Sequence, residues 1–185
     1  MNDSNYADLV SAVRKRFFGR YRGLVVDTAD STERGRLLVQ VPAILDELNV
    51  WAMPSTPYAG DAVGFYTLPP IGSGVWVVFE GGDPSYPVWT GGFWADNQLP
   101  DESDEAIKVI KTDTLYIRMD DTESEILLNA NDAATVEIKD KVLQTVGSGS
   151  HLVEGGKVVA DSGGTGKVEV TSSSVKVNGG ALEVT

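Results

Sequence analysis

Two groups of carboxylates are the residues of this chain whose types and spacing come nearest to acid–base or metal chemistry. Asp27, Asp30 and Glu33, with Arg34 and Arg36 beside them, lie in a polar segment between two apolar runs. Two carboxylates do acid–base work when they are about 5–9 Å apart. Charges on a polar turn more often face solvent, so we expect no catalysis in this group.

The second group comprises Asp120, Asp121, Glu123 and Glu125. Carboxylate oxygens are the ligands that Ca²⁺ prefers, but the run lacks the Asp-x-Asp-x-Asp-Gly pattern of a calcium loop. The sequence therefore predicts a solvated turn here.

Histidine and glycine add little chemistry. His151 is the only histidine, and cysteine is absent. Three copies of His151 could meet as metal ligands if the chain were a trimer, but we expect an exposed or merely packed side chain. The tracts 72–74 and 163–166 are rich in glycine but lack the lysine of a phosphate-binding loop, so they are predicted turns. We expect no catalytic residue, cofactor or metal, and hence no enzyme.

The four tryptophans, Trp51, Trp76, Trp89 and Trp94, allow two interpretations. They could stack on a ligand, or they could fill the core of a small barrel. We expect the core.

Charge and composition limit the function further. The 185 residues are 42% hydrophobic and carry a net charge of −12. An acidic surface disfavours nucleic acid. The start, Met1 to Asn5, has no basic and apolar signal-peptide pattern, and no apolar run approaches the roughly 20 residues of a membrane span. We therefore expect synthesis in the cytoplasm.

The segments that must position these residues differ in composition and hydrophobic periodicity. Residues 4–18 predict a short amphipathic helix that ends at Gly19, within an arm of residues 1–19. Residues 20–98 contain all the tryptophan and phenylalanine beyond that arm. Their period-two runs, 22–27, 35–41, 51–54, 64–69, 74–80 and 87–94, predict a small closed barrel such as an OB-fold, with no second helix.

Residues 99–106 are acidic and aperiodic, which predicts a linker. From Ile107 to Thr185, short runs of alternating Val, Ile and Leu are separated by polar or glycine turns about every ten residues. We expect strands at 108–111, 114–119, 125–128, 135–139, 157–159, 167–171, 175–177 and 182–184.

This second region has too little core for one chain. Its strands offer one or two aliphatic side chains per face, which cannot offset an ordering cost of about 1–2 kcal/mol per residue, and its open edges would invite aggregation. Three chains wound about one axis would remove both problems, although the sequence does not give the number three. The alternative is local disorder, chiefly at 147–150 and 161–166.

Residues 20–94 closely resemble the baseplate-spike family, which includes phage baseplate assembly protein V and VgrG proteins. The resemblance rests on five blocks in the family's order: Tyr21–Asp27, Gly35–Pro42, Trp51–Pro54 with Pro57–Gly60, Leu68–Asp83 and Pro87–Trp94. It implies an all-β homotrimer with an OB-fold followed by an intertwined triple-stranded β-helix needle. It also implies a structural central spike of a contractile phage tail or injection-system baseplate, which links the hub to the tip and pierces the target envelope mechanically.

The chain departs from some relatives in ways that affect its partners. The short linker leaves no room for a peptidoglycan-cleaving domain. The C-terminal segment lacks a His-x-His metal motif, so we expect a separate PAAR-type tip protein to dock at Leu182, Val184 and Thr185. The sequence shows no hub domain before the barrel, so we expect the hub to be another protein. The alternative function is an OB-fold module that binds oligosaccharide or single-stranded nucleic acid and carries an unrelated tail. The sequence does not distinguish a virion tail from a secretion or extracellular injection machine.

Overall fold

The computed structural model describes residues 10–11, 13 and 15–184. The chain forms two compact units, residues 1–98 and 99–185. No helix in the described ranges has the length and hydropathy of a membrane span.

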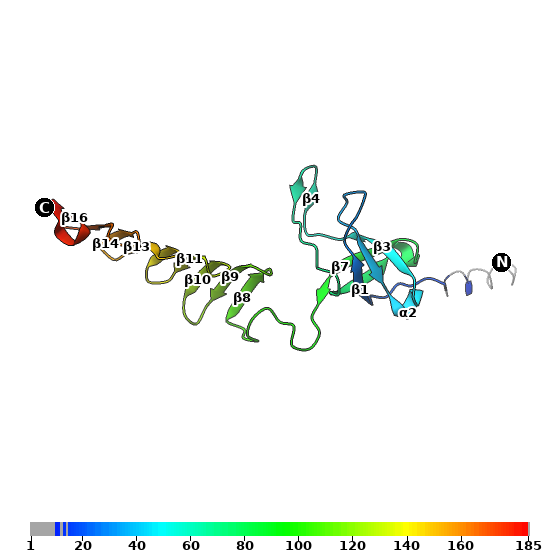
Figure 1. Cartoon of the computed structure of the whole chain (residues 1–185). Coiled ribbons are helices and arrows are strands. Elements are labelled where there is room, and N and C mark those ends of the chain that lie inside the picture. The colour runs from blue at the N-terminus through cyan, green and yellow to red at the C-terminus, as the bar shows by residue number, and fades with distance from the viewer. Residues whose placement is uncertain (1–9, 12, 14, 185) are drawn as a thin grey trace. The chain divides into compact units, whose positions relative to one another are not determined.

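A closed barrel of five strands makes up most of the N-terminal unit (Figure 1). The strands are β1 (Tyr21–Asp27), β2 (Leu37–Gln40), β3 (Asn49–Pro54), β6 (Gly74–Phe79) and β7 (Pro87–Phe93). Their order around the barrel is β1-β2-β3-β7-β6, with β6 returning to β1. The pair β3–β7 is parallel and the others are antiparallel. The predicted closed barrel of OB type is confirmed.

The barrel core follows from the alternation of its strands. In β6, Val75, Val77 and Phe79 point inward and are buried, while the residues between them are only partly buried. Strands β1, β2, β3 and β7, with the residue that follows β2, contribute the other buried members of the core: Val25, Leu37, Val39, Val41, Ala52 and Trp89. A side-chain period of two fixes which residues enter the core.

The prediction that the tryptophans fill this core is wrong for three of the four. Trp89 is 6% exposed and belongs to the core. Trp51 and Trp76 are half-buried, and Trp94 is 64% exposed. The reason for Trp76 is its strand phase, because inward-pointing Val75 and Val77 flank it on β6.

Two elements of the N-terminal unit differ from the sequence prediction. A short helix, α2 (Pro42–Leu45), begins after β2 with proline in its first turn. The expected strand at 64–69 is reduced to the hairpin of β4 (Ala59–Gly60) and β5 (Val63–Gly64), which projects from the barrel (Figure 1). Pro69 and Pro70 lack the N–H groups that a longer ladder would need. A 3₁₀ turn, η1 (Glu80–Gly82), follows β6.

Most of the helix predicted at 4–18 lies outside the described residues. Its described C-terminal end, residues 16–18, is not helical. The Phe17 backbone N–H donates to the Gly82 carbonyl at 2.8 Å, and Arg16 pairs with Asp83 at 3.0 Å. This end of the arm therefore packs on its own barrel.

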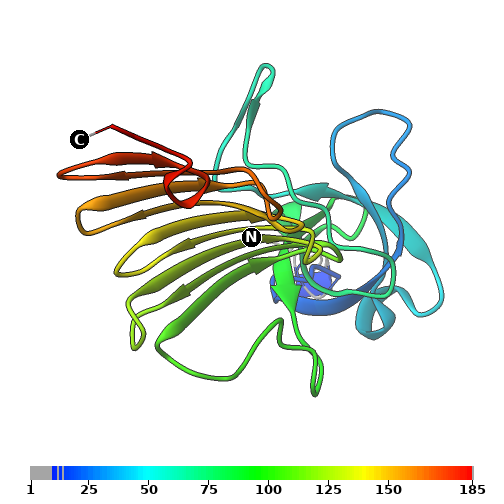
Figure 2. The ribbon, with the colours of Figure 1, turned by 60° about the vertical axis from the view of Figure 1, so that its left-hand side comes forward.

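The C-terminal unit is a ten-stranded antiparallel meander (Figure 2). In order, the strands are β8 (Ile107–Lys111), β9 (Leu115–Asp120), β10 (Glu125–Ala130), β11 (Ala134–Ile138), β12 (Val142–Val146), β13 (Gly149–Glu154), β14 (Lys157–Asp161), β15 (Lys167–Thr171), β16 (Val175–Val177) and β17 (Leu182–Val184). A 3₁₀ turn, η2 (Asn178–Gly180), joins the last two. Each strand pairs with its neighbour in sequence, and the polar and glycine segments predicted as turns connect the strands, with some of their end residues included in the strands.

The sequence prediction missed β12 and β13. Residues 147–150 had the composition of a loop, but the turn needs only Gly147 and Ser148, and Gly149 already lies in β13. The alternative of disorder at 147–150, which the sequence disfavoured, is therefore wrong. At 161–166, Asp161 ends β14 and the residues after it form the connection to β15.

The inner strands of the meander have both edges paired within the chain. The expected pairing of every strand edge with another chain is thus not required for them. The thin core is confirmed, since Val159 is the only buried hydrophobic residue among the described residues of this unit. The winding of three chains into one β-helix stays a prediction.

Candidate assembly surface

One face of the β8–β17 sheet is apolar along most of its run. Residues directly opposite each other on paired strands share a face, and the register sets aliphatic against aliphatic, as in Ile117 opposite Leu128 and Val158 opposite Val170. We call this the apolar face. Large side chains on it, 37–70% exposed, are Ile110, Leu115, Ile117, Met119, Ile126, Leu128, Ile138, Val146, Val153, Val158, Val168, Val170, Val175 and Leu182.

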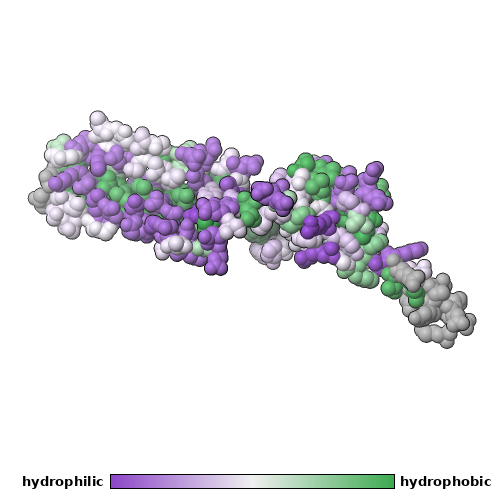
Figure 3. All heavy atoms as spheres, turned by 90° about the horizontal axis from the view of Figure 1, so that it is seen from below, coloured by the Kyte–Doolittle hydropathy of each residue, from purple (hydrophilic) through white to green (hydrophobic). Residues whose placement is uncertain are grey.

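The opposite face of the sheet, which we call the polar face, differs sharply. It carries a central line of aliphatic residues, in which Leu143 lies opposite Leu152 and Leu152 opposite Val159. Charged pairs flank this line, such as Lys157 with Glu154 at 2.8 Å, and the pair raises the pKa of Lys157. In Figure 3 hydrophilic residues predominate on the side of this unit turned to the viewer.

A continuous apolar surface of this extent is uncommon on a monomeric protein and marks an interaction site. Each exposed side chain on the apolar face has aliphatic neighbours on the adjoining strands. A surface of this kind can bind a partner by burial of apolar area, which is non-directional.

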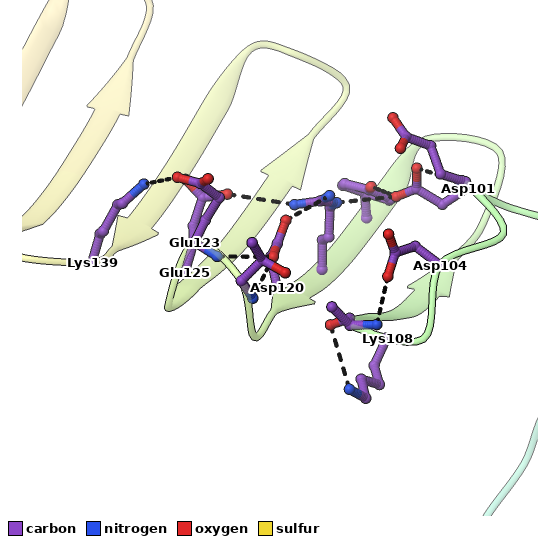
Figure 4. A network of polar contacts seen from close by, with 12 residues as sticks. Asp101, Asp104, Lys108, Asp120, Glu123, Glu125 and Lys139 are labelled. Carbon is purple, nitrogen blue, oxygen red and sulfur yellow. Dashed lines mark hydrogen bonds and ion pairs between the residues drawn. The ribbon is translucent and has the colours of Figure 1, made fainter.

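A network of charges holds residues 99–106 to the first strands on the polar face (Figure 4). The Arg118 guanidinium contacts Asp101 at 3.2 Å, Asp120 at 2.9 Å and Glu125 at 3.6 Å. The Tyr116 hydroxyl donates to the same Asp101 carboxylate. Because Asp101 precedes the sheet and Glu125 lies on β10, Arg118 joins three successive parts of the chain.

These contacts shift the pKa values of the groups involved. The hydrogen bond from Tyr116 lowers the pKa of Asp101, and burial together with this carboxylate raises the pKa of Tyr116 to about 12. The backbone N–H of Glu123 is the largest cause that lowers the pKa of Asp120. The ionised carboxylates are therefore the favoured forms, as a structural ion-pair network requires.

The network explains the second carboxylate group and corrects one detail of its prediction. Asp120 is buried rather than solvated. Glu123 pairs with Lys139 at 2.6 Å, and Asp121 pairs with Lys108. Within the described ranges no group of three or more His, Cys, Asp or Glu residues is arranged to hold a metal ion. Arg118 and Tyr116 were missed from the sequence, although the period-two spacing of Tyr116, Arg118 and Asp120 indicates one shared face.

Asp30, a member of the first carboxylate group, is also held in structural contacts. Asp30 binds the Arg36 guanidinium at 2.7 Å and accepts hydrogen bonds from the backbone N–H groups of Thr32 and Arg34. These contacts, led by Arg36, hold the pKa of Asp30 far below its ordinary value. A carboxylate so fully engaged is not available as a general base.

The remaining predicted residues lie on the apolar face or at its end. His151 is on β13, opposite Gln144 of β12 and Ala160 of β14. Of the three residues expected to dock a tip protein, Leu182 is 60% exposed on β17. Val184 lies in the same strand, and Thr185 lies outside the described residues.

The outer face of the barrel does not present free aromatic platforms at the half-buried tryptophans. Trp76 packs against Phe93 with ring centroids 5.1 Å apart, and the Arg22 guanidinium lies over both rings. Arg36 lies over Trp51 at 5.3 Å. Because these arginines already cover the rings, the nucleic-acid alternative gains no support here.

The barrel matches the model of a known protein family. Residues 21–94 match the model of the type VI secretion system/phage-baseplate injector OB domain. No curated protein matches the chain. The match begins with β1 and ends just after β7, so it covers the whole closed barrel. The barrel is therefore similar to the OB domain of type VI secretion system/phage-baseplate injectors, and residues outside 21–94 are not covered by the match.

Proposed function

We propose that the chain is the central spike of a contractile phage tail or injection-system baseplate, and that it works as a homotrimer. The observation that carries the proposal is the apolar face of β8–β17, whose large side chains are exposed in the single chain. The family of the barrel supports a baseplate location.

Three copies of the sheet, each turning its apolar face to a common axis, would enclose a continuous hydrophobic interior. The polar face would then meet solvent, with its ion pairs such as Lys139–Glu123 and Lys157–Glu154. Each chain keeps its own antiparallel pairing in this arrangement. Association therefore supplies the core that one chain lacks.

The two units would serve different partners. The barrel would bind a separate hub protein. The outer edge of β17, which pairs with no strand of the described residues, would receive a PAAR-type tip protein beside Leu182. The assembled spike would puncture the target envelope mechanically, without chemistry on the membrane.

The oligomeric state of the full chain tests the proposal. Light scattering should give about three times 19.8 kDa, or about 59 kDa. A monodisperse monomer at micromolar concentration would contradict it.

A matched pair of variants tests the surface. Val136 and Thr135 are neighbours on β11, but Val136 lies opposite Leu128 on the apolar face, while Thr135 lies opposite Asn129 on the polar face. Each lysine substitution adds one positive charge to the same strand. Val136→Lys should abolish the trimer and Thr135→Lys should preserve it, because a buried charge without a partner is costly. Equal behaviour of the two variants would exclude the apolar face as the interface.

A further inference from the structure

The apolar face is interrupted in its middle by one polar pair. Gln144 on β12 lies directly opposite His151 on β13. On its other side Gln144 faces Val136 of β11, and His151 faces Ala160 of β14. Among the described side chains of this face, the other polar one is Lys108, on the first strand.

Everything around the pair is apolar or small. Along their strands, Gln144 is flanked on this face by Val142 and Val146, and His151 by Gly149 and Val153. No charged side chain of the adjoining strands β11 and β14 faces the pair. In the described single chain neither Gln144 nor His151 makes a side-chain hydrogen bond, so both polar groups are left for another partner.

The aliphatic rows on this face are too uniform to define how chains align. One row passes across the strands through Val142, Val153, Val158, Val170 and Val175. A second chain displaced by one hairpin would meet valine with valine again. Burial of apolar area therefore stabilises association without selecting one alignment, as in uniform hydrophobic seams.

Resting on the proposed trimer, we infer that Gln144 and His151 form an interchain hydrogen-bonded layer that fixes the alignment of the three chains. A glutamine amide has two donors and an acceptor oxygen, and a neutral imidazole has one donor and one acceptor. Three copies of each, gathered in one layer of an apolar interior, can complete one another's hydrogen bonds. Misaligned chains would bury these groups against valine, where an unpaired polar group is costly.

A double-mutant cycle on the full-length trimer tests the layer. Gln144→Leu and His151→Leu should each lower the thermal midpoint, because each leaves a buried partner unpaired. The double variant should recover at least the parental midpoint, because it removes both polar groups. The matched control is Val142→Leu with Val153→Leu, an opposed apolar pair whose effects should show no such recovery.

Alignment itself is measured by spin labels. The chain has no cysteine, so Ser173→Cys in the exposed turn between β15 and β16 gives one label per chain. Double electron–electron resonance should give one narrow distribution of interspin distances in the parent trimer. In the Gln144→Leu/His151→Leu trimer the distribution should be broad or have several peaks. The Val142→Leu/Val153→Leu control should keep the narrow distance.

The outcomes separate this inference from the proposed function. If the parent is monomeric, the proposed spike fails and the layer fails with it. If the parent is trimeric but the two leucine effects add and the distance stays narrow, the layer alone is wrong. A chelator that lowers the midpoint of the parent and of Gln144→Leu, but not of His151→Leu, would also overturn it, since the three imidazoles would then hold a metal.

Discussion

The Trp89 indole Nε1–H donates a hydrogen bond to the backbone carbonyl of Gly35 at 3.3 Å, across 54 residues of sequence. The bond joins β7 to the end of the turn that leads into β2. Gly35 has φ of +70°, a conformation that residues with a Cβ rarely adopt. The one tryptophan in the barrel core is therefore also hydrogen-bonded to the backbone of the turn between β1 and β2.

Trp89 should be the tryptophan on which barrel stability depends most. Trp89→Ala should lower the free energy of unfolding by about 3–5 kcal/mol, because it empties a buried site. Trp76→Ala should cost about 1–2 kcal/mol, since its ring packs on the outer face. Trp94→Ala, the exposed control, should stay within about 0.5 kcal/mol. Denaturant unfolding, followed by fluorescence of the remaining tryptophans, measures these changes. A larger loss of unfolding free energy for Trp76→Ala than for Trp89→Ala would mean that Trp76, and not its neighbours on β6, points into the core.

Asp30 should make the barrel sensitive to acid. Its pKa is lowered in the folded chain, chiefly by Arg36, so its contribution to stability is present above the ordinary aspartate pKa of about 4 and is lost as the pH falls further. Asp30→Asn should lower the thermal midpoint at pH 7 and flatten its dependence on pH below 4. Tryptophan fluorescence reports this transition, because all four tryptophans lie in the N-terminal unit. Asp61→Asn serves as the exposed control, and an equal flattening in that variant would remove Asp30 as the cause.

Tyr116 should make the C-terminal unit sensitive to alkali. Its pKa is raised to about 12, first by burial and then by Asp101, so the neutral phenol is favoured in the folded chain. The resulting stabilisation is full below the ordinary tyrosine pKa of about 10 and is lost as the pH rises to about 12. Tyr116→Phe should cost about 1 kcal/mol at pH 7 and remove this alkaline loss. Far-ultraviolet circular dichroism from pH 8 to 12 measures this alkaline loss of structure, and Tyr66→Phe, at an exposed tyrosine, is the control. An alkaline profile of Tyr116→Phe that equals the parent's would contradict the role of the hydroxyl.

Two neighbouring glycines should respond differently to alanine. Gly163 has φ of +75°, and a Cβ there would lie 2.3 Å from the Ser148 carbonyl oxygen. Gly164 has space for a Cβ, whose nearest heavy atom would be 3.8 Å away. Gly163→Ala should therefore destabilise the C-terminal unit by more than about 1 kcal/mol, and Gly164→Ala by less than about 0.5 kcal/mol. Thermal unfolding compares the pair; indistinguishable midpoints would mean that the 162–166 connection moves freely.

Removing β17 should separate tip docking from assembly. The Asn178 side chain accepts a hydrogen bond from the Lys167 backbone N–H at 2.9 Å, so the cut belongs after Gly180. A chain lacking residues 181–185 should remain trimeric, because β8 to β16 are kept, and should lose binding to a PAAR-type tip protein. Co-purification with that protein and light scattering are the two measurements. Retained binding would place the docking site elsewhere, and loss of the trimer would make β17 part of the assembly nucleus.

The barrel was predictable because its strands are bounded by proline and glycine, and because five ordered blocks resemble one family. Strand phase was less secure: Val75, Trp76 and Val77 are all apolar, so alternation alone does not decide which points inward. Strand β13 could not be predicted from the sequence, because Gly149 and Ser150 are residues typical of turns. They become extended through the pairing of β13 with β12 and β14.

The contacts on the apolar face, and the contacts that hold residues 99–106 to the sheet, depend on the register of strand pairing. The sequence alone does not give that register. Asp101 was predicted within a linker, and its contacts with Tyr116 and Arg118 appear only when β9 is placed. Gln144 and His151 are seven residues apart, and a two-residue turn brings them face to face. The expectation that the chain associates, in contrast, needed only the count of aliphatic residues per strand. The number three came from the family resemblance and stays a prediction.

The number of strands in the β8–β17 meander sets the length of the sheet. Its ten strands span nine intervals of about 4.8 Å, or about 43 Å, and each hairpin added or removed changes that reach by about 10 Å. Because each strand pairs with its neighbours in sequence, an insertion of one hairpin would leave the pairing on both sides of it unchanged. The length of the sheet can therefore evolve in discrete steps by duplication or loss of one hairpin of about 17 residues, while the barrel and the distal end keep their own contacts.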